Sequence, residues 1–116
     1  MHYIRSLVSL MVIVAGSSPL LVYASDTSRG EAIYNTTCLV CHGSDGTGNM
    51  PGVADLTKKM AGLYQSDKVL LNRMLNGYQS TDSSMEMPAR GGDPALTESD
   101  LKDVLMFMRE KFQVPR

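Results

Sequence analysis

Both cysteines of the chain and one of its two histidines fall within five residues. Cys38 and Cys41 are separated by two residues, and His42 follows directly. Residues three apart lie on the same side of a helical turn, so the two thiols would point the same way beside an imidazole. Residues 43–52 are rich in glycine and contain Pro51, a composition that excludes regular structure. The only thiols of the chain are therefore predicted to lie on a helical turn that ends in a loop.

The spacing of these residues is typical of covalent haem attachment. Two thiols on one side can add to the two vinyl groups of one haem, and the imidazole of His42 then ligates the iron. Three other interpretations compete. A disulfide would close a very small loop and contribute little to stability, a redox-active dithiol needs a preceding strand, and a zinc site needs four ligands. The sequence favours one haem c, bound covalently through Cys38 and Cys41.

The start of the chain has the features of a secretory signal peptide. It opens with a positive charge, residues 7–15 are apolar, and residues 22–24 resemble a cleavage site. An uncleaved membrane anchor is the alternative, but the apolar span is short for a membrane helix and Pro19 interrupts it. We expect residues 1–24 to be removed and residues 25–116 to form one domain. Export suits covalent haem attachment, which takes place outside the cytoplasm, and predicts a periplasmic location.

The charge and the aromatic content of the remaining 92 residues narrow the function. They carry ten basic and twelve acidic side chains. Nucleic-acid binding usually requires a basic face, so this balance argues against nucleic acid as a partner. The same residues include five aromatic side chains and no tryptophan. A domain of this size has difficulty burying enough apolar surface alone, so a cofactor is expected to complete its core.

Two helices are predicted in the first half of this domain. Residues 28–40 are predicted to form a helix capped by Ser28, with Glu31 in the position of a capping box. Residues 53–63 are predicted to form a second, short helix. No segment alternates for long as a strand does, so the sequence indicates an all-α fold.

The second half contains two better-marked helices. One begins after Ser66 and ends at Gly77, and the last is capped by Thr97. Between them, residues 79–94 form a long loop rich in Ser, Asp, Gly and Pro. A loop of this length in a compact domain is usually functional or disordered.

Several segments together resemble the class I c-type cytochromes, in particular short bacterial members with one haem. The resemblance covers residues 29–112. It rests on residues 38–43, 46–48, 51, 54–56, 87–92 and 96–101. It implies a small cytochrome c fold for residues 25–116, with three to five helices around one covalently attached haem. It also implies a one-electron carrier rather than an enzyme, with redox proteins as donor and acceptor, and a membrane partner only if the signal stays uncleaved.

The second axial ligand of the iron is expected to be a methionine, since thioether sulfur suits haem iron in an electron carrier. Met60, Met74, Met106 and Met108 lie on predicted helices, where packing in the core explains a methionine. Met50 lies too close to His42 along the chain to reach the opposite side of the haem. Met85 and Met87 remain, both in the long loop. Met87 precedes Pro88, which favours an extended backbone, and the resemblance selects the methionine before proline. His42 and Met87 are therefore the expected iron ligands, while Met85 packs near the haem edge or faces solvent.

The resemblance also implies supporting roles. The carbonyl of Pro51 is expected to accept a hydrogen bond from the imidazole of His42, which would orient the ring and raise its basicity. Gly30 and Tyr34 are expected where the first helix crosses the last, because a missing Cβ lets two helices approach closely.

Two other functions stay open at this point. A haem domain that senses a gas or catalyses a reaction would need a displaceable sixth ligand. A haem subunit of a larger oxidoreductase would carry the same motifs as a free carrier. The sequence names neither the donor nor the acceptor.

Overall fold

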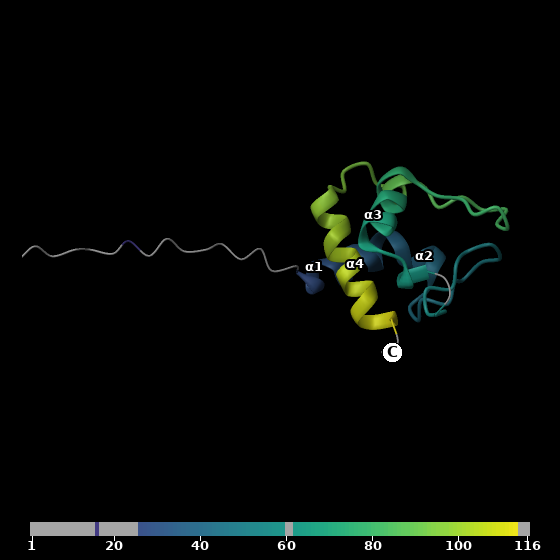
Figure 1. Ribbon diagram of the computed structural model, residues 1–116, viewed down its shortest axis with the longest axis horizontal. Coiled ribbons are helices and arrows are strands. Elements are labelled where there is room, and N and C mark those ends of the chain that lie inside the picture. Colours follow the sequence, from purple (N-terminus) through teal and green to yellow (C-terminus); the bar gives the residue numbers. More distant parts are fainter. Residues whose placement is uncertain (1–15, 17–25, 60–61, 114–116) are drawn as a thin grey trace, which may run out of the picture.

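The computed structural model describes residue 16 and residues 26–59 and 62–113, and this part of the chain is helical (Figure 1). The predicted signal peptide, residues 1–24, lies outside these residues apart from position 16. The elements are the helices α1 (Thr27–Ile33), α2 (Leu39–His42), α3 (Asp67–Asn76) and α4 (Glu98–Phe112), a π-helical turn (Tyr34–Cys38) and two 3-10 turns (Gly62–Tyr64 and Ala89–Gly92). Extended pairing in the described residues consists of one isolated bridge, between Tyr78 and Met87. The predicted all-α class is confirmed.

The first predicted helix begins earlier than expected and is not uniform. The carboxylate of Asp26 accepts hydrogen bonds from the backbone N–H groups of Ser28 and Arg29, at 3.1 and 3.2 Å. The prediction of Ser28 as the cap is therefore wrong. Asp26 offers a charged acceptor to the free N–H groups of the first turn. At Tyr34 the helix changes to a π-helical turn, which apolar periodicity does not reveal.

Helices α1 and α4 pack against each other (Figure 1), and Gly30 lies at this contact. A Cβ atom at this position would lie 2.1 Å from the carbonyl oxygen of Asp103, so the approach requires glycine. One turn further along, the buried ring of Tyr34 lies 5.4 Å from the rings of Phe107 and Phe112, measured between centroids. Such tilted aromatic pairs stabilise a core beyond their buried area. The predicted crossing at Gly30 and Tyr34 is confirmed.

The two later helices begin where their capping residues predict. The hydroxyl of Ser66 accepts a hydrogen bond from the backbone N–H of Val69 at the start of α3. Thr97 and Asp100 form a reciprocal capping box at the start of α4. Helix α3 then packs against α4, so local capping fixes the boundaries of both helices and tertiary packing fixes their arrangement.

The short helix predicted for residues 53–63 is wrong. Residues 53–59 follow an irregular path, residues 60–61 lie outside the described part, and only Gly62–Tyr64 forms a 3-10 turn. The carboxylate of Asp55 accepts hydrogen bonds from the backbone N–H and the hydroxyl of Thr57, at 2.9 and 2.6 Å. This local turn competes with a helix for the same backbone group.

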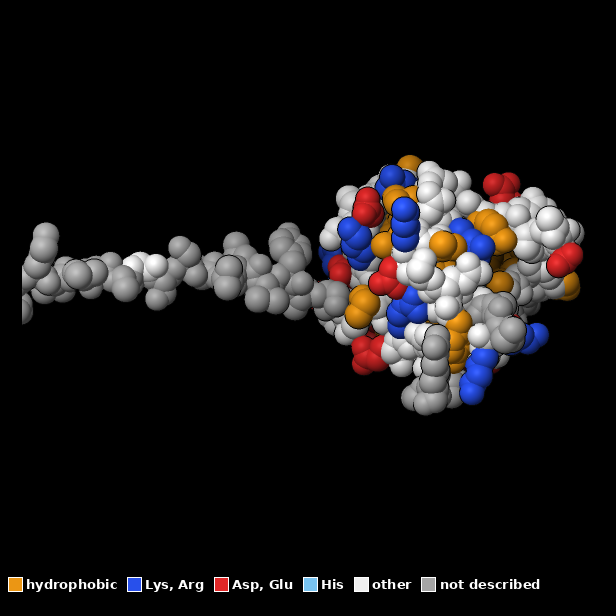
Figure 2. Space-filling view, in the orientation of Figure 1, with side chains coloured by type: hydrophobic (Ala, Val, Ile, Leu, Met, Phe, Trp, Pro, Cys, Tyr) orange, Lys and Arg blue, Asp and Glu red, His pale blue; other side chains and the backbone are white. Residues whose placement is uncertain are grey.

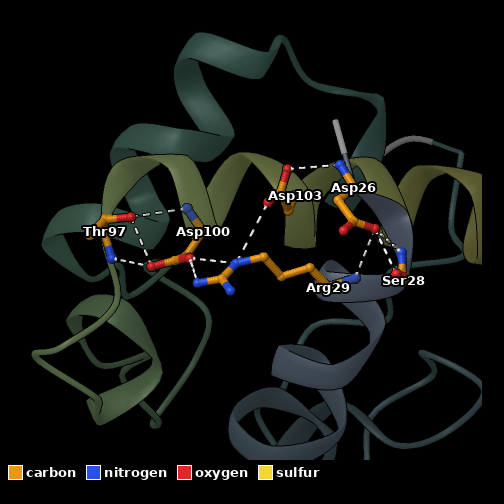
Figure 3. A network of polar contacts seen from close by, with 6 residues as sticks. All are labelled: Asp26, Ser28, Arg29, Thr97, Asp100 and Asp103. Carbon is orange, nitrogen blue, oxygen red and sulfur yellow. Dashed lines mark hydrogen bonds and ion pairs between the residues drawn. The ribbon is translucent and has the colours of Figure 1, made fainter. Parts of the chain in front are cut away.

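A polar network ties the start of α1 to the start of α4 (Figure 3). The guanidinium of Arg29 donates to the carboxylate of Asp100 and lies 3.9 Å from that of Asp103. Asp103 in turn accepts a hydrogen bond from the backbone N–H of Asp26 at 3.2 Å. Hydrogen bonds from the backbone N–H of Thr97, and then from Arg29, lower the pKa of Asp100 to about 2. Ionised Asp100 thus links both helices.

This depressed pKa predicts a loss of stability in acid. Because the pKa of Asp100 falls from 3.8 to about 2 on folding, its contribution is complete above pH 3.8 and is lost as the pH falls toward 2. Asp100→Asn is expected to lower the free energy of unfolding at neutral pH and to flatten its pH dependence between pH 4 and about 2. Denaturant titrations at several pH values measure this. Asp82→Asn, in an exposed loop position, is the control, and equal slopes for both variants would contradict the prediction.

Candidate functional site

The two cysteines lie at the junction of the π-helical turn and α2. Cys38 ends the turn, and Cys41 and His42 belong to α2. Both thiols are free and half-buried. Burial raises the pKa of the Cys38 thiol to about 11, and the electrostatic influence of Cys41 acts in the same direction. The two thiols are therefore not joined in a disulfide, and both are free to serve as attachment points for one haem.

The loop after α2 folds back onto the helix end. Gly43 leaves the helix with φ +82°, a backbone conformation that favours glycine. The backbone N–H of Gly48 then donates to the carbonyl of His42 at 2.9 Å, and that of Asn49 to the carbonyl of Cys41 at 2.8 Å. The side-chain amide of Asn49 also reaches the carbonyl of Leu39 at 3.3 Å. The free carbonyls at the end of α2 are thus satisfied, which fixes the attachment motif.

The side chain of His42 is half-buried. Burial lowers its pKa, and hydrogen bonding with the backbone of Ala54 opposes this shift. The Nδ1 atom is buried and has no hydrogen-bond partner among the described residues. No hydrogen bond joins Pro51 to His42 in this part of the chain, and Pro51 is exposed, so the acceptor role expected for Pro51 stays a prediction. The neutral form favoured by burial is the form that ligates metals.

Met87 is held by its backbone. Its N–H donates to the carbonyl of Tyr78 at 2.8 Å, and its carbonyl accepts from the N–H of Tyr78 at 3.0 Å. Pro88 follows with φ −69° and ψ 151°, in the extended region. The side chain of Met87 is half-buried and packs against the hydrophobic core. The extended conformation predicted from Met87-Pro88 therefore fits the isolated bridge, and the sulfur is attached to a fixed stretch of backbone.

The remaining methionines divide into core and surface residues. Met74 and Met108 are buried, as predicted. Met106 is 39% exposed, so its assignment to the core is wrong: it lies on the outer side of α4. Met50 is 37% exposed, Met60 lies outside the described residues, and Met85 is half-buried.

The core is incomplete beside Cys38 and Met87. Several apolar side chains pack against it and remain half-buried. They are Ile33, Cys38, Leu39, Leu71, Leu75, Met87 and Leu96. They come from the first helical stretch, from α3 and from the long loop, so the apolar surface is built by segments distant in sequence. A small domain gains stability when such a surface is covered.

These observations meet the requirements of a haem. The structure offers two free thiols, a buried imidazole nitrogen, a thioether on a loop held by backbone hydrogen bonds, and half-buried apolar side chains packed against the core. Thiols and imidazole suit covalent attachment and iron ligation, and the apolar side chains suit a large flat porphyrin. Within the described residues, no group of three or more His, Cys, Asp or Glu side chains could hold a metal ion. The donor set therefore fits haem better than zinc.

Comparison with known proteins gives the family. The model of the family described as "Cytochrome c" matches residues 27–111. The chain belongs to the cytochrome c family. Cytochromes c carry covalently attached haem c and transfer electrons, so this chain is a haem electron carrier.

Several relatives cover most of this cytochrome. It is 28% identical over 103 residues to cytochrome c-555 of Chlorobaculum tepidum, with 89% of each chain covered. It is 29% identical over 83 residues to cytochrome c-555 of Chlorobaculum thiosulfatiphilum, covering 72% of this chain and 93% of the relative. A match of 28% over 98 residues to the cbb3-type cytochrome c oxidase subunit CcoP of Cereibacter sphaeroides covers 82% of this chain and 33% of that subunit.

One face of this cytochrome carries charges of both signs side by side. On the face seen in Figure 2, Lys and Arg side chains alternate with Asp and Glu, and apolar side chains lie between them. Across residues 26–59 and 62–113, no helix is both long enough and apolar enough to span a membrane.

Two residues that shape the site were missed from the sequence. Asn49 follows a run of glycines, and asparagine is found near helix C-termini, so a weak signal existed. For Tyr78 the sequence contains no such signal, because no local pattern indicates that its backbone pairs with that of Met87, nine residues later.

Proposed function

We propose that this cytochrome carries one haem c, attached through Cys38 and Cys41 and ligated by His42 and Met87. The observation that carries this proposal is the placement of Met87. Two backbone hydrogen bonds to Tyr78 fix it, and its side chain packs against the same core as Cys38. The imidazole of His42 would be the first ligand of the iron and the thioether of Met87 the second.

These ligands favour electron transfer over catalysis. The bound haem supplies an iron that takes up and releases one electron. His42 and Met87 would both ligate the iron, and no coordination position would then be left for a substrate. Ligation by methionine and histidine raises the reduction potential relative to ligation by two histidines. Half-buried Leu71 and Leu75 pack against the core and would help to shield the haem from water, which is a further influence on the potential.

The wild-type protein, produced with a haem-attachment system, tests this proposal. It is expected to titrate as a single one-electron couple and to show the weak far-red absorption band of methionine-ligated ferric haem. Its reduced form is expected to bind carbon monoxide slowly, because the sulfur must first leave. Rapid binding of carbon monoxide would show an open sixth position and would favour the gas-sensing or catalytic function.

We also propose that residues 1–24 are a cleaved signal and that residues 25–116 act as the cytochrome c domain in the periplasm. The charged start, the short apolar run and the small residue at position 24 support this. Intact-mass measurement of the exported protein is expected to place the N-terminus at Ser25. Retention of Met1 would indicate a membrane-anchored carrier.

A second candidate is a haem subunit of a larger oxidoreductase. The match to CcoP supports it, because the matched segment makes up a third of that longer subunit. In either case the donor and the acceptor would be redox proteins. Purification from native membranes separates the two: a free carrier is expected to elute alone, whereas a subunit would stay with its complex.

A further inference from the structure

The loop between Tyr78 and Met87 is closed at its base and touches a second loop further out. Backbone hydrogen bonds of 3.0 and 2.8 Å pair Tyr78 with Met87 at the base. The chain then turns through residues 79–86, where the N–H of Ser83 donates to the carbonyl of Ser80 at 3.1 Å. Figure 1 shows this green loop and the teal loop after α2 projecting to the same side of the molecule.

The hydroxyl of Ser83 joins these two loops. It donates to the carbonyl of Gly52 at 2.6 Å, across 31 residues of sequence. It also accepts a hydrogen bond from the backbone N–H of Met85 at 3.1 Å, and the carbonyl of Met85 lies 3.0 Å away. A serine hydroxyl has one proton and two lone pairs, so donation to Gly52 and acceptance from Met85 can occur together. One side chain therefore fixes its own loop and fastens it to the other.

Packing around Gly52 shows that the loops meet closely. A Cβ atom at Gly52, where φ is +89°, would lie 3.1 Å from the Ser83 hydroxyl oxygen and 3.4 Å from the Cβ of Met85. The shortest of these distances is tighter than ordinary van der Waals contact. The hydrogen bond from Ser83 thus lies where the two loops leave little room for a side chain at Gly52.

We propose that Ser83 is a positioning residue. It holds the loop that carries Met87 against the loop that follows α2, and so keeps the methionine sulfur on the ferric iron. This inference rests on the proposed ligation. Thioether sulfur is a soft ligand that suits reduced iron better than oxidised iron. The hydrogen bond from Ser83 therefore matters most in the ferric state, where the sulfur leaves the iron more readily.

The experiment measures the rate at which cyanide binds the ferric protein with its haem attached. Cyanide can bind only when the Met87 sulfur has left, so the rate reports how often the loop opens. Ser83→Ala is expected to increase this rate about fivefold, the factor that corresponds to the loss of one typical hydrogen bond. The far-red band is expected to persist at room temperature and to disappear on heating at a lower temperature than in the wild type.

Two matched variants separate positioning from a general loss of stability. Ser84→Ala removes the exposed neighbouring hydroxyl and is expected to bind cyanide at the wild-type rate. Ser83→Thr keeps a hydroxyl and is expected to restore that rate. A cyanide rate within about twofold of wild type for Ser83→Ala, even with a lower unfolding temperature, would overturn the proposal, as would equal acceleration in Ser84→Ala. A wild-type protein without the far-red band would instead overturn the ligation by Met87.

Discussion

The double variant Cys38→Ala, Cys41→Ala is expected to be recovered without covalently bound haem. In the wild type, thioether bonds should keep the colour with the chain through denaturation and acid extraction. The variant has no nucleophile at either position, so any haem it collects should be extracted. Its chain is expected to be poorly folded, because Leu71 and Leu75 would lose the cover for an apolar surface that a domain of this size needs. Haem staining after denaturing electrophoresis and circular dichroism measure the two effects.

The matched control for this variant is Val40→Ala. Val40 lies between the two cysteines and is 69% exposed, so its truncation should leave both haem attachment and helicity unchanged. A colourless wild-type protein from a strain able to attach haem would refute the attachment site. Cooperative unfolding of the haem-free chain, close to that of the complete protein, would show that the core does not depend on the cofactor.

The parts of the fold that follow from local chemistry could be predicted from the sequence. Ser66 and Thr97 cap their helices through hydrogen bonds that span three residues, and such bonds form wherever the local pattern allows them. The close approach at Gly30 was predicted as well, through the resemblance to cytochromes rather than from periodicity. A single glycine creates no periodic pattern in the sequence, and whether it allows a close helix contact depends on which helix packs against it.

The errors in the fold arise where two local structures compete. For residues 53–63 both a short helix and a turn at Asp55 were compatible with the sequence. The turn forms, because the carboxylate of Asp55 accepts hydrogen bonds from the backbone N–H and the hydroxyl of Thr57. At the start of α1, Asp26 and Ser28 are both good caps, and Asp26 takes the role. Composition alone could not rank the members of either pair.

For the candidate site, the sequence identified the chemical groups but not the structure that holds them. Cys38, Cys41 and His42 were recognisable because their spacing is itself the requirement of the chemistry. The bridge between Tyr78 and Met87, and the hydrogen bond from Ser83 to the second loop, join residues that no periodic pattern relates. Loop geometry of this kind depends on tertiary contacts, which explains why the ligand was predicted and its support was missed.

Met87→Ala is expected to remove the far-red band of the ferric protein and to open the iron to cyanide and carbon monoxide. Alanine provides no sulfur, so water or hydroxide takes the sixth position, and neither stabilises the reduced state as a thioether does. The reduction potential is expected to fall by at least about 60 mV, the equivalent of a tenfold change in a one-electron equilibrium. Absorption spectra, ligand-binding kinetics and a redox titration measure the three changes.

Met85→Ala is the control that makes this result specific to one sulfur. Met85 is half-buried two residues before Met87, but it does not belong to the apolar set that packs against the core. Its backbone N–H is bonded to the Ser83 hydroxyl at 3.1 Å, a contact that truncation of the side chain preserves. Met85→Ala is therefore expected to keep the far-red band, with only a small change in potential from altered solvent access. Loss of the band in Met85→Ala and its retention in Met87→Ala would reverse the assignment of the ligand, because each variant removes one of the two sulfur atoms in the loop and leaves the backbone bridge to Tyr78 intact.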